Sequence, residues 1–118
     1  MEKVNYNINQ SVFKVGEKSD KMFLIVKGSV GIFLPTNETR IPNFTLEGNE
    51  LFGEMGVIEN ELRSATARCL EDSEIISVTK EEFDERVNNS DVFIKGCLKA
   101  LSYRLRALNK KMKTDFFY

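Results

Sequence analysis

The residues best suited to bind a ligand lie close together in the stretch LFGEMGVIENELRSAT. Glu54 follows Gly53, where a backbone without a side chain lets a ligand approach closely. Nine residues further on, Arg63 offers a permanently charged guanidinium fork, and Ser64 adds a hydroxyl. The residues between them can form one helical turn, whose free amides favour anions. A cation, a hydroxyl and free amides together suit a phosphate group.

The carboxylate of Glu54 needs a different partner, because it would repel a phosphate. We expect it to accept a hydrogen bond from a neighbouring hydroxyl, such as that of a ribose. Ala65 leaves room for the ligand, and we expect the Arg63 side chain to face that ligand rather than the core. The pattern therefore describes a sugar phosphate in a crevice with a short helix. An ordinary ion pair between Glu54 and Arg63 is the alternative that spacing alone leaves open.

The composition indicates a binding protein rather than an enzyme. The chain has no histidine and only two cysteines among 118 residues, which removes histidine-activated nucleophiles and cysteine clusters for zinc, iron–sulfur or haem. We therefore predict no catalytic residue, no metal site and no prosthetic group. Cys69 and Cys97 both sit in apolar patterns, and we expect them to be reduced core residues.

The charge balance and length favour one soluble domain. The net charge is −1, so no bulk field attracts the chain to nucleic acid or to a membrane. The first residues lack the apolar run of a signal peptide, and no segment approaches 18 apolar residues. We expect a cytoplasmic protein that contains one domain over residues 1–118.

Residues 11 to about 78 show the pattern of a β domain. Short apolar runs alternate with glycine-rich or polar turns, which favours a sandwich, a jelly roll or a small barrel. The predicted strands cover residues 12–15, 22–26, 30–34, 44–46, 65–70 and 75–78.

Two helices are predicted after the strands. Thr79 and Glu82 have the spacing of a capping box, which starts a helix over residues 80–88. Ser90 is a good N-cap for a second helix over residues 91–113. Apolar residues follow a heptad spacing along that helix, at Ile94, Leu98, Leu101, Leu105, Leu108 and Met112.

The heptad seam of the second helix has two explanations. The helix can pack on its own domain, or Leu98, Leu101, Leu105, Leu108 and Met112 can form the seam of a homodimer. From residue 95 to residue 113 the helix also carries seven basic residues and no acidic one. Binding of nucleic acid through this basic helix is a further alternative, although the cations surround an apolar seam.

These motifs resemble the cyclic-nucleotide-binding domain family of catabolite-activator-type regulators, kinase regulatory subunits and cyclic-nucleotide-gated channels. The run FGEM…VI…RSAT is similar to the family's phosphate-binding cassette, and VFKVGEKSDKMFLIVKGSVGIF is similar to its opening strands. The resemblance implies a mainly β fold, with an eight-stranded antiparallel, jelly-roll-like β-roll over about residues 6–78 and two C-terminal helices. The family's preceding helix is missing or reduced to residues 1–5, and we expect no effector domain.

The resemblance also implies a role for each cassette residue. Arg63, Ser64 and Ala65 correspond to the ligands of the cyclic phosphate, and Gly53 and Glu54 to those of the ribose. Candidates for contact with the base are Ile32, Phe33, Leu46, Thr66, Tyr103 and Arg104. The chain departs from the family where Gly56 stands in place of a common alanine.

The expected function is that of a cyclic-nucleotide sensor. We expect cAMP as the ligand, with cGMP left open, and a homodimer that signals through the last helix to an unidentified protein. A degenerate roll that only mediates dimerisation is the main alternative.

Overall fold

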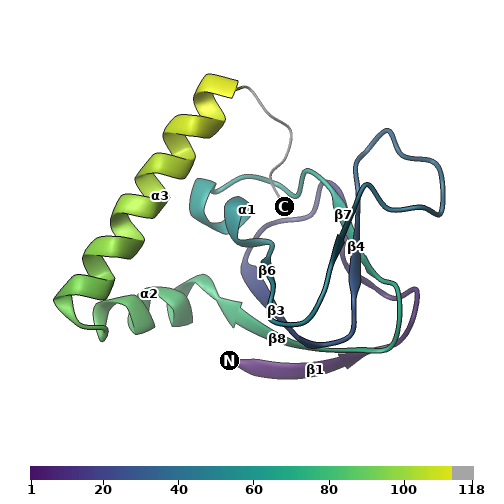
Figure 1. Cartoon of the computed structure of the whole chain (residues 1–118), viewed down its shortest axis with the longest axis horizontal. Coiled ribbons are helices and arrows are strands. Elements are labelled where there is room, and N and C mark those ends of the chain that lie inside the picture. Colours follow the sequence, from purple (N-terminus) through teal and green to yellow (C-terminus); the bar gives the residue numbers. More distant parts are fainter. Residues whose placement is uncertain (113–118) are drawn as a thin grey trace.

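Two four-stranded antiparallel sheets build the body of the protein, and helices follow at its C-terminal end (Figure 1). The computed structural model describes residues 1–112, and for residue 106 and residues 109–112 the backbone alone. The first sheet has the strand order β1-β8-β3-β6, and the second has the order β2-β7-β4-β5. The elements are β1 (Glu2–Tyr6), β2 (Ser11–Phe13), β3 (Lys21–Lys27), β4 (Val30–Phe33), β5 (Phe44–Leu46), β6 (Leu51–Phe52), α1 (Glu54–Glu59), β7 (Thr66–Cys69), β8 (Ser73–Thr79), α2 (Lys80–Asn88) and α3 (Val92–Met112).

The hydrophobic core lies between the two sheets. Side chains alternate along the strands, so every second residue of β7 and β8 is buried. Ile25, Ile32, Phe52 and Ile75 are fully buried in this core. The predicted fold class, a mainly antiparallel β domain with eight strands and C-terminal helices, is confirmed.

Two of the eight strands have no clear signal in the sequence. β1 occupies residues 2–6, where we expected no element or a reduced helix, and it pairs antiparallel with β8. Its side chains are mostly exposed, so it lacks a strong apolar alternation. β6 has only two residues and pairs with β3 through Phe23 and Phe52. The strands therefore begin at Glu2, before the expected residue 6.

The predicted capping box at the start of α2 is confirmed. The backbone N–H of Glu82 donates to Thr79 Oγ1 at 3.1 Å, and the N–H of Thr79 donates to Glu82 Oε1 at 3.1 Å. The expected N-cap of α3 was wrong, because the N–H of Ile94 donates to Asp91 Oδ1. The hydroxyl of Ser90 instead donates to the carbonyl of Val87 and closes α2.

The two cysteines have different environments. Cys69 is fully buried in the core, as expected. Cys97 is exposed on α3, so the expectation that it is a core residue was wrong.

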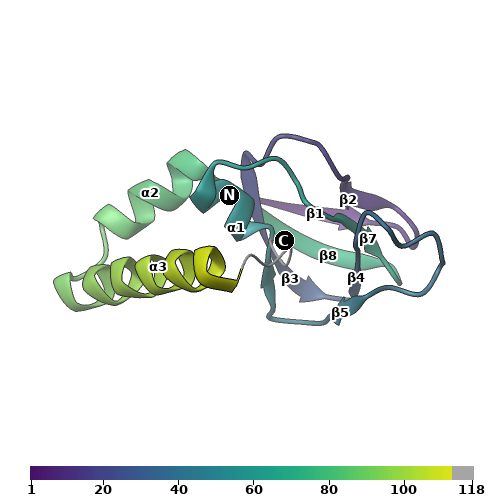
Figure 2. The ribbon, with the colours of Figure 1, turned by 90° about the horizontal axis from the view of Figure 1, so that it is seen from above.

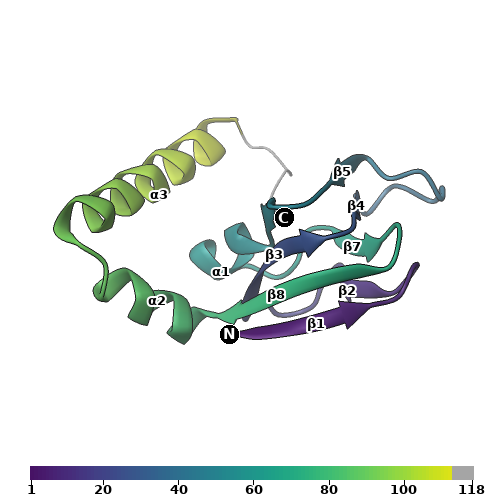
Figure 3. The ribbon, with the colours of Figure 1, turned by 60° about the horizontal axis from the view of Figure 1, so that its bottom comes forward.

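Helix α2 leads away from the two sheets, and α3 turns back beside it, so that the end of α3 lies nearer the sheets than its start (Figures 1, 2 and 3). The main neighbour of α3 is α2. Leu98 faces a groove between the two helices. By contrast, Leu101, Leu105 and Leu108 are between 43% and 54% exposed, so packing on the roll does not explain this part of the seam. The side chain of Met112 lies outside the described residues. No helix among the described residues is long and apolar enough to span a bilayer.

Candidate functional site

The cassette begins where β6 ends and α1 starts. Gly53 adopts a left-handed conformation with φ of 77° and forms the N-cap position of α1. A Cβ at this position would lie 3.1 Å from Arg63 Nη1 and equally near the rings of Phe13 and Phe23. Glycine therefore meets both needs, the positive φ and the close approach of Arg63.

The Arg63 side chain is anchored inside the protein. It is only 4% exposed, Nη1 donates to the Gly53 carbonyl at 2.6 Å, and Nη2 donates to the Lys21 carbonyl at 2.5 Å. The guanidinium carbon lies 4.2 Å from the centre of the Phe13 ring, a cation–π contact. The expectation that this side chain does not face the core was therefore wrong. Arg63 stabilises the crevice through contacts of its own.

Glu54 and Arg63 do not form the ordinary ion pair that spacing left open. No oxygen of Glu54 lies within 4 Å of a guanidinium nitrogen of Arg63. Instead, Glu54 Oε2 and Arg63 Nε are both buried with no hydrogen-bond partner among the described residues. A buried polar atom without a partner costs about 1–3 kcal/mol, so the folded chain leaves two unmet bonds in this cassette.

Burial controls the protonation of both groups. It raises the pKa of the Glu54 carboxyl above its ordinary 4.5, against a backbone hydrogen bond and the Arg63 charge, which act to lower that pKa. Burial lowers the pKa of the Arg63 guanidinium, and the charges of Asp20, Glu17 and Glu54 oppose that change. The guanidinium stays charged at neutral pH because its ordinary pKa is so high.

Backbone hydrogen bonds hold the turn before β7 in place. The N–H of Arg63 donates to the Glu17 carbonyl at 2.8 Å, and the N–H of Gly16 donates to the Arg63 carbonyl at 2.8 Å. Ser64 is half-buried, whereas Ala65 is 1% exposed and packs in the core cluster. The Ala65 side chain thus serves packing, which leaves its backbone as the part that can serve a ligand.

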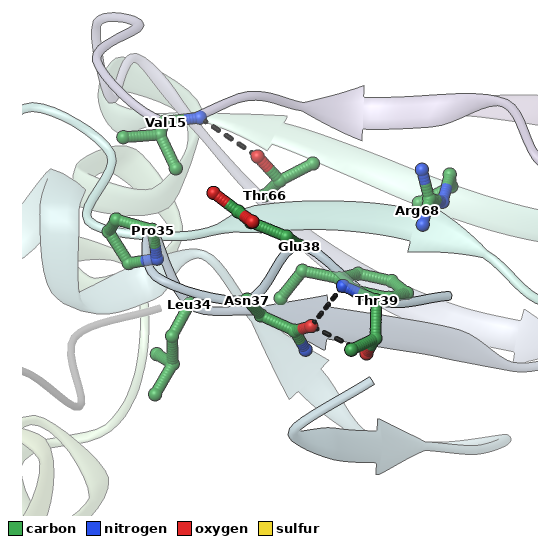
Figure 4. Close-up of a pocket in the computed structure, with 9 residues that line it drawn as sticks. Val15, Leu34, Pro35, Asn37, Glu38, Thr39, Thr66 and Arg68 are labelled. Atoms are coloured by element: carbon green, nitrogen blue, oxygen red, sulfur yellow. Dashed lines mark hydrogen bonds between the residues drawn. The ribbon is translucent and has the colours of Figure 1, made fainter. Parts of the chain in front are cut away.

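The residues expected at the base do not gather at one place. Ile32 and Leu46 lie in the core between the sheets. Phe33, the next residue after Ile32, contacts Arg68 on the other face of β4. Thr66 lines the same outer region, and its Oγ1 accepts a hydrogen bond from the Val15 N–H at 3.2 Å (Figure 4).

The two base candidates on α3 also lie elsewhere. Tyr103 and Arg104 are exposed, and Tyr103 lines a groove of about 520 Å³ between α2 and α3. The lining of this groove includes none of the described cassette residues. The structure thus brings Gly53, Glu54 and Arg63 together but leaves the base candidates apart.

Sequence reasoning missed two residues that shape the cassette. Lys21 supplies a carbonyl to Arg63 from 42 positions away, and any residue type offers a carbonyl. Ser19 packs so closely on α1 that a Cβ at Gly56 would lie 2.2 Å from Ser19 Oγ. This contact explains why glycine stands at position 56, where the resemblance led us to expect alanine. The contact joins distant residues, so no local sequence pattern predicts it.

The chain belongs to the cyclic nucleotide-binding domain family, whose model matches residues 3–90. It is 22% identical over 118 residues to the CRP-like cAMP-activated global transcriptional regulator of Mycobacterium tuberculosis, covering 99% of this chain and 53% of that protein. It is 30% identical over 79 residues to the cyclic nucleotide-gated potassium channel mll3241 of Mesorhizobium japonicum, covering 67% of this chain and 21% of the channel.

A solved structure resembles the chain over almost its whole length. The half-site-occupied form of the EAL enzyme Bd1971 superposes with a TM-score of 0.82 at 37% identity, covering 92% of this chain and 97% of that chain. Its cAMP-bound form matches with a TM-score of 0.68 at 36% identity, covering 95% of this chain and 30% of that chain. A cGMP-bound form of Bd1971 matches as well, with a TM-score of 0.70. The chain spans about half the length of the transcriptional regulators that it matches.

Proposed function

We propose that this domain binds cAMP in the cassette formed by Gly53, Glu54, Arg63 and Ser64, and that cGMP is its second ligand. Membership of the family supports a cyclic nucleotide as the ligand class. Bd1971, at 35–37% identity, has been solved with cAMP and with cGMP, which supports these two nucleotides in particular.

The observation that carries the proposal is the pair of unmet hydrogen bonds in the cassette. Arg63 has five N–H donors, of which the carbonyls of Gly53 and Lys21 take two. Nε and a terminal nitrogen remain for two parallel bonds to one phosphate. The Ser64 hydroxyl and the Ala65 amide complete the phosphate contacts in this proposal.

The carboxylate of Glu54 is suited to the ribose. Its unpartnered Oε2 can accept a hydrogen bond from the 2′-hydroxyl, which supplies the bond that the folded chain lacks. A 2′-deoxy ligand leaves this oxygen unsatisfied. The cassette therefore discriminates for a ribose as well as for a cyclic phosphate.

The domain is proposed to regulate and not to catalyse. We place residues 1–118 in one domain that acts in the cytoplasm. The domain of the Bd1971 enzyme that resembles it makes up 30% of the cAMP-bound chain, so an enzyme can carry such a domain beside other parts. If this domain is part of a longer protein, ligand binding by the domain does not reveal the activity of the other parts.

Helix α3 is proposed to carry the signal and to pair with the same helix of a second copy. Leu101, Leu105 and Leu108 present an exposed apolar seam that a partner helix can bury. Ligand can shift α3 only through contacts that differ between the free and bound states. Hydrogen exchange along residues 92–112 should therefore slow when cAMP is added, and identical exchange in both states would contradict this role.

Calorimetric titration tests the proposed ligand. The protein is titrated with cAMP, cGMP, 2′-deoxy-cAMP and 5′-AMP under the same conditions. We expect saturable heat with cAMP, weaker heat with 2′-deoxy-cAMP, and no loss of the cAMP heat when 5′-AMP is already present, because 5′-AMP should not compete for the cassette. Absence of heat with every cyclic nucleotide would favour the degenerate dimerisation module.

A further inference from the structure

A second cavity lies on the outer face of the β2-β7-β4-β5 sheet. It measures about 350 Å³, within the usual range for small-ligand pockets. Its lining consists of Asn9, Phe33, Arg40, Arg68 and Leu70. None of these residues belongs to the cassette.

Strand register fixes the first of the two arginines. Arg68 on β7 stands opposite Gly31 on β4, and Thr66 stands opposite Phe33. Because Gly31 has no side chain, the Phe33 ring can lie close over it, and a Cβ there would be 3.0 Å from Phe33 Cε1. The guanidinium carbon of Arg68, the diagonal neighbour of Phe33, lies 4.2 Å from the centre of that ring. Phe33 itself is only 5% exposed, so the guanidinium rests on a fixed aromatic surface.

The loop between β4 and β5 carries the second arginine, Arg40, whose side chain is exposed. The Asn37 amide donates to the Ile41 carbonyl and to Asn43 Oδ1, both at 2.8 Å, and so joins the chain before Arg40 to the chain after it. The Thr39 N–H donates to Asn37 Oδ1 at 2.8 Å (Figure 4). These bonds hold the backbone of the loop from which Arg40 reaches the cavity.

No acid within residues 1–112 forms an ion pair with the charges at this cavity. Both guanidiniums line it, and no carboxylate is among its lining residues. Among the described residues, neither arginine has an acid within ion-pair distance. Glu38 lines the adjoining cavity of about 290 Å³, and its carboxylate points away from Arg68 (Figure 4). Two cations facing one hollow repel each other unless an anion lies between them.

We propose that this cavity binds a phosphate monoester of a small organic molecule. Such a group carries a charge of about −1.5 to −2 at neutral pH, which matches two guanidinium forks. The Asn9 side chain can add an amide donor, and Leu70 beside the Phe33 ring offers apolar surface for the carbon part of the ligand. A cyclic phosphate has only one negative charge, so this site and the cassette differ in their preferred ligand.

The site stands apart from the proposed function. The side chains of Thr66 and Arg68 are partly exposed on the outer face of β7, whereas Ala67 and Cys69 between and beyond them are buried in the core. Occupation of the cassette by cAMP should therefore leave the outer cavity open.

NMR titration of the isotope-labelled protein at low salt tests this site. Inorganic phosphate and 5′-AMP are the probes, each added with and without saturating cAMP. We expect saturable shifts at the amides of residues 31–40 and 66–70 and at the side-chain Nε–H of Arg40 and Arg68. We expect tighter binding of 5′-AMP than of inorganic phosphate. Equal affinity for 5′-AMP and inorganic phosphate would contradict the proposal of an organic phosphate monoester.

Two single variants and a charge-matched control decide the outcome. Arg40→Gln and Arg68→Gln should each weaken binding of 5′-AMP by about tenfold, and Glu38→Gln should strengthen it. Arg86→Gln removes the same charge from the exposed surface of α2 and should change nothing. Unsaturable shifts, or equal weakening by all three arginine variants, would overturn the proposal. An unchanged melting temperature of Arg68→Gln shows that a loss of binding is not a loss of fold.

Discussion

Replacement of Arg63 by alanine should damage both ligand binding and folding. The side chain donates to the carbonyls of Gly53 and Lys21 and lies against the Phe13 ring, so truncation removes three contacts of the unliganded protein. It also removes the charged fork that the proposed cyclic phosphate would contact. The two consequences can be measured separately.

The structure sets the size of each effect. Hydrogen bonds from a charged donor contribute about 1.5–3 kcal/mol each. The two bonds to carbonyls are partly offset by the cost of burying the guanidinium, so we expect a loss of about 2–5 kcal/mol in the free energy of unfolding. A domain of this size has about 5–15 kcal/mol in total, so the variant should still fold at low temperature. Loss of the buried phosphate partner should weaken cAMP binding by about 30-fold to several thousand-fold.

One denaturation experiment reports both quantities. Urea unfolding without ligand gives the loss of stability. Repeating it with cAMP at 100 times the wild-type dissociation constant should stabilise the wild type by about 2.7 kcal/mol, and Arg63→Ala by at most about 0.9 kcal/mol if its binding is 30-fold weaker. Arg63→Lys should recover only part of either effect, since an ammonium cannot reproduce the fork. Arg86→Ala, an exposed arginine on α2, is the matched control and should behave as wild type.

Two results would refute this reasoning. If cAMP stabilises Arg63→Ala as much as the wild type, the phosphate does not bind at Arg63. If the free energy of unfolding is unchanged without ligand, the two hydrogen bonds to backbone carbonyls contribute nothing.

Three further variants probe other contacts. Glu54→Gln removes a carboxyl group whose pKa is raised in the folded protein. In the wild type, this group stabilises the fold below pH 4.5 and loses that contribution as the pH rises through its higher folded pKa. At pH 7 the unliganded variant should therefore unfold at a higher urea concentration than the wild type. Its cAMP affinity should be weaker and should no longer fall as the pH is lowered toward the ordinary carboxyl pKa of 4.5. A pH profile parallel to that of the wild type would implicate another group. Gly56→Ala should lower the free energy of unfolding in urea by about 1–3 kcal/mol, although alanine has the higher helix propensity, because its Cβ would clash with Ser19. Adding Ser19→Gly to this variant should restore stability, whereas a Gly56→Ala variant more stable than the wild type would disprove the clash. Leu105→Lys with Leu108→Lys should give a folded monomer by light scattering, whereas a monomeric wild type at tens of micromolar would end the dimer proposal.

The cassette could be predicted because its information is local. Gly53, Glu54, Arg63 and Ser64 lie within twelve residues, and the short helix between them follows from the same segment. The capping box of α2 was predictable for the same reason, since its two bonds join residues three positions apart. Strands with strong apolar alternation were found, whereas the exposed β1 and the two-residue β6 were not.

The separation of the base candidates was partly within reach of the sequence. Ile32 and Phe33 are consecutive in a strand, and a period of two puts them on opposite faces. The position of Tyr103 was not within reach, because the direction of α3 depends on the turn at Asn89–Asp91 and on its contact with α2.

The sequence by itself determined which chemical groups the cassette contains, and the tertiary structure decided how those groups are used. Arg63 is read from the chain as a charged fork, yet its anchoring depends on a carbonyl from β3 and a ring from β2. Backbone carbonyls are the same for every residue type, so the sequence does not indicate which carbonyl will accept a hydrogen bond from Arg63. The unmet bonds at Glu54 and Arg63 arise in the same way, because burial by distant strands removes water from atoms for which residues 1–112 supply no partner.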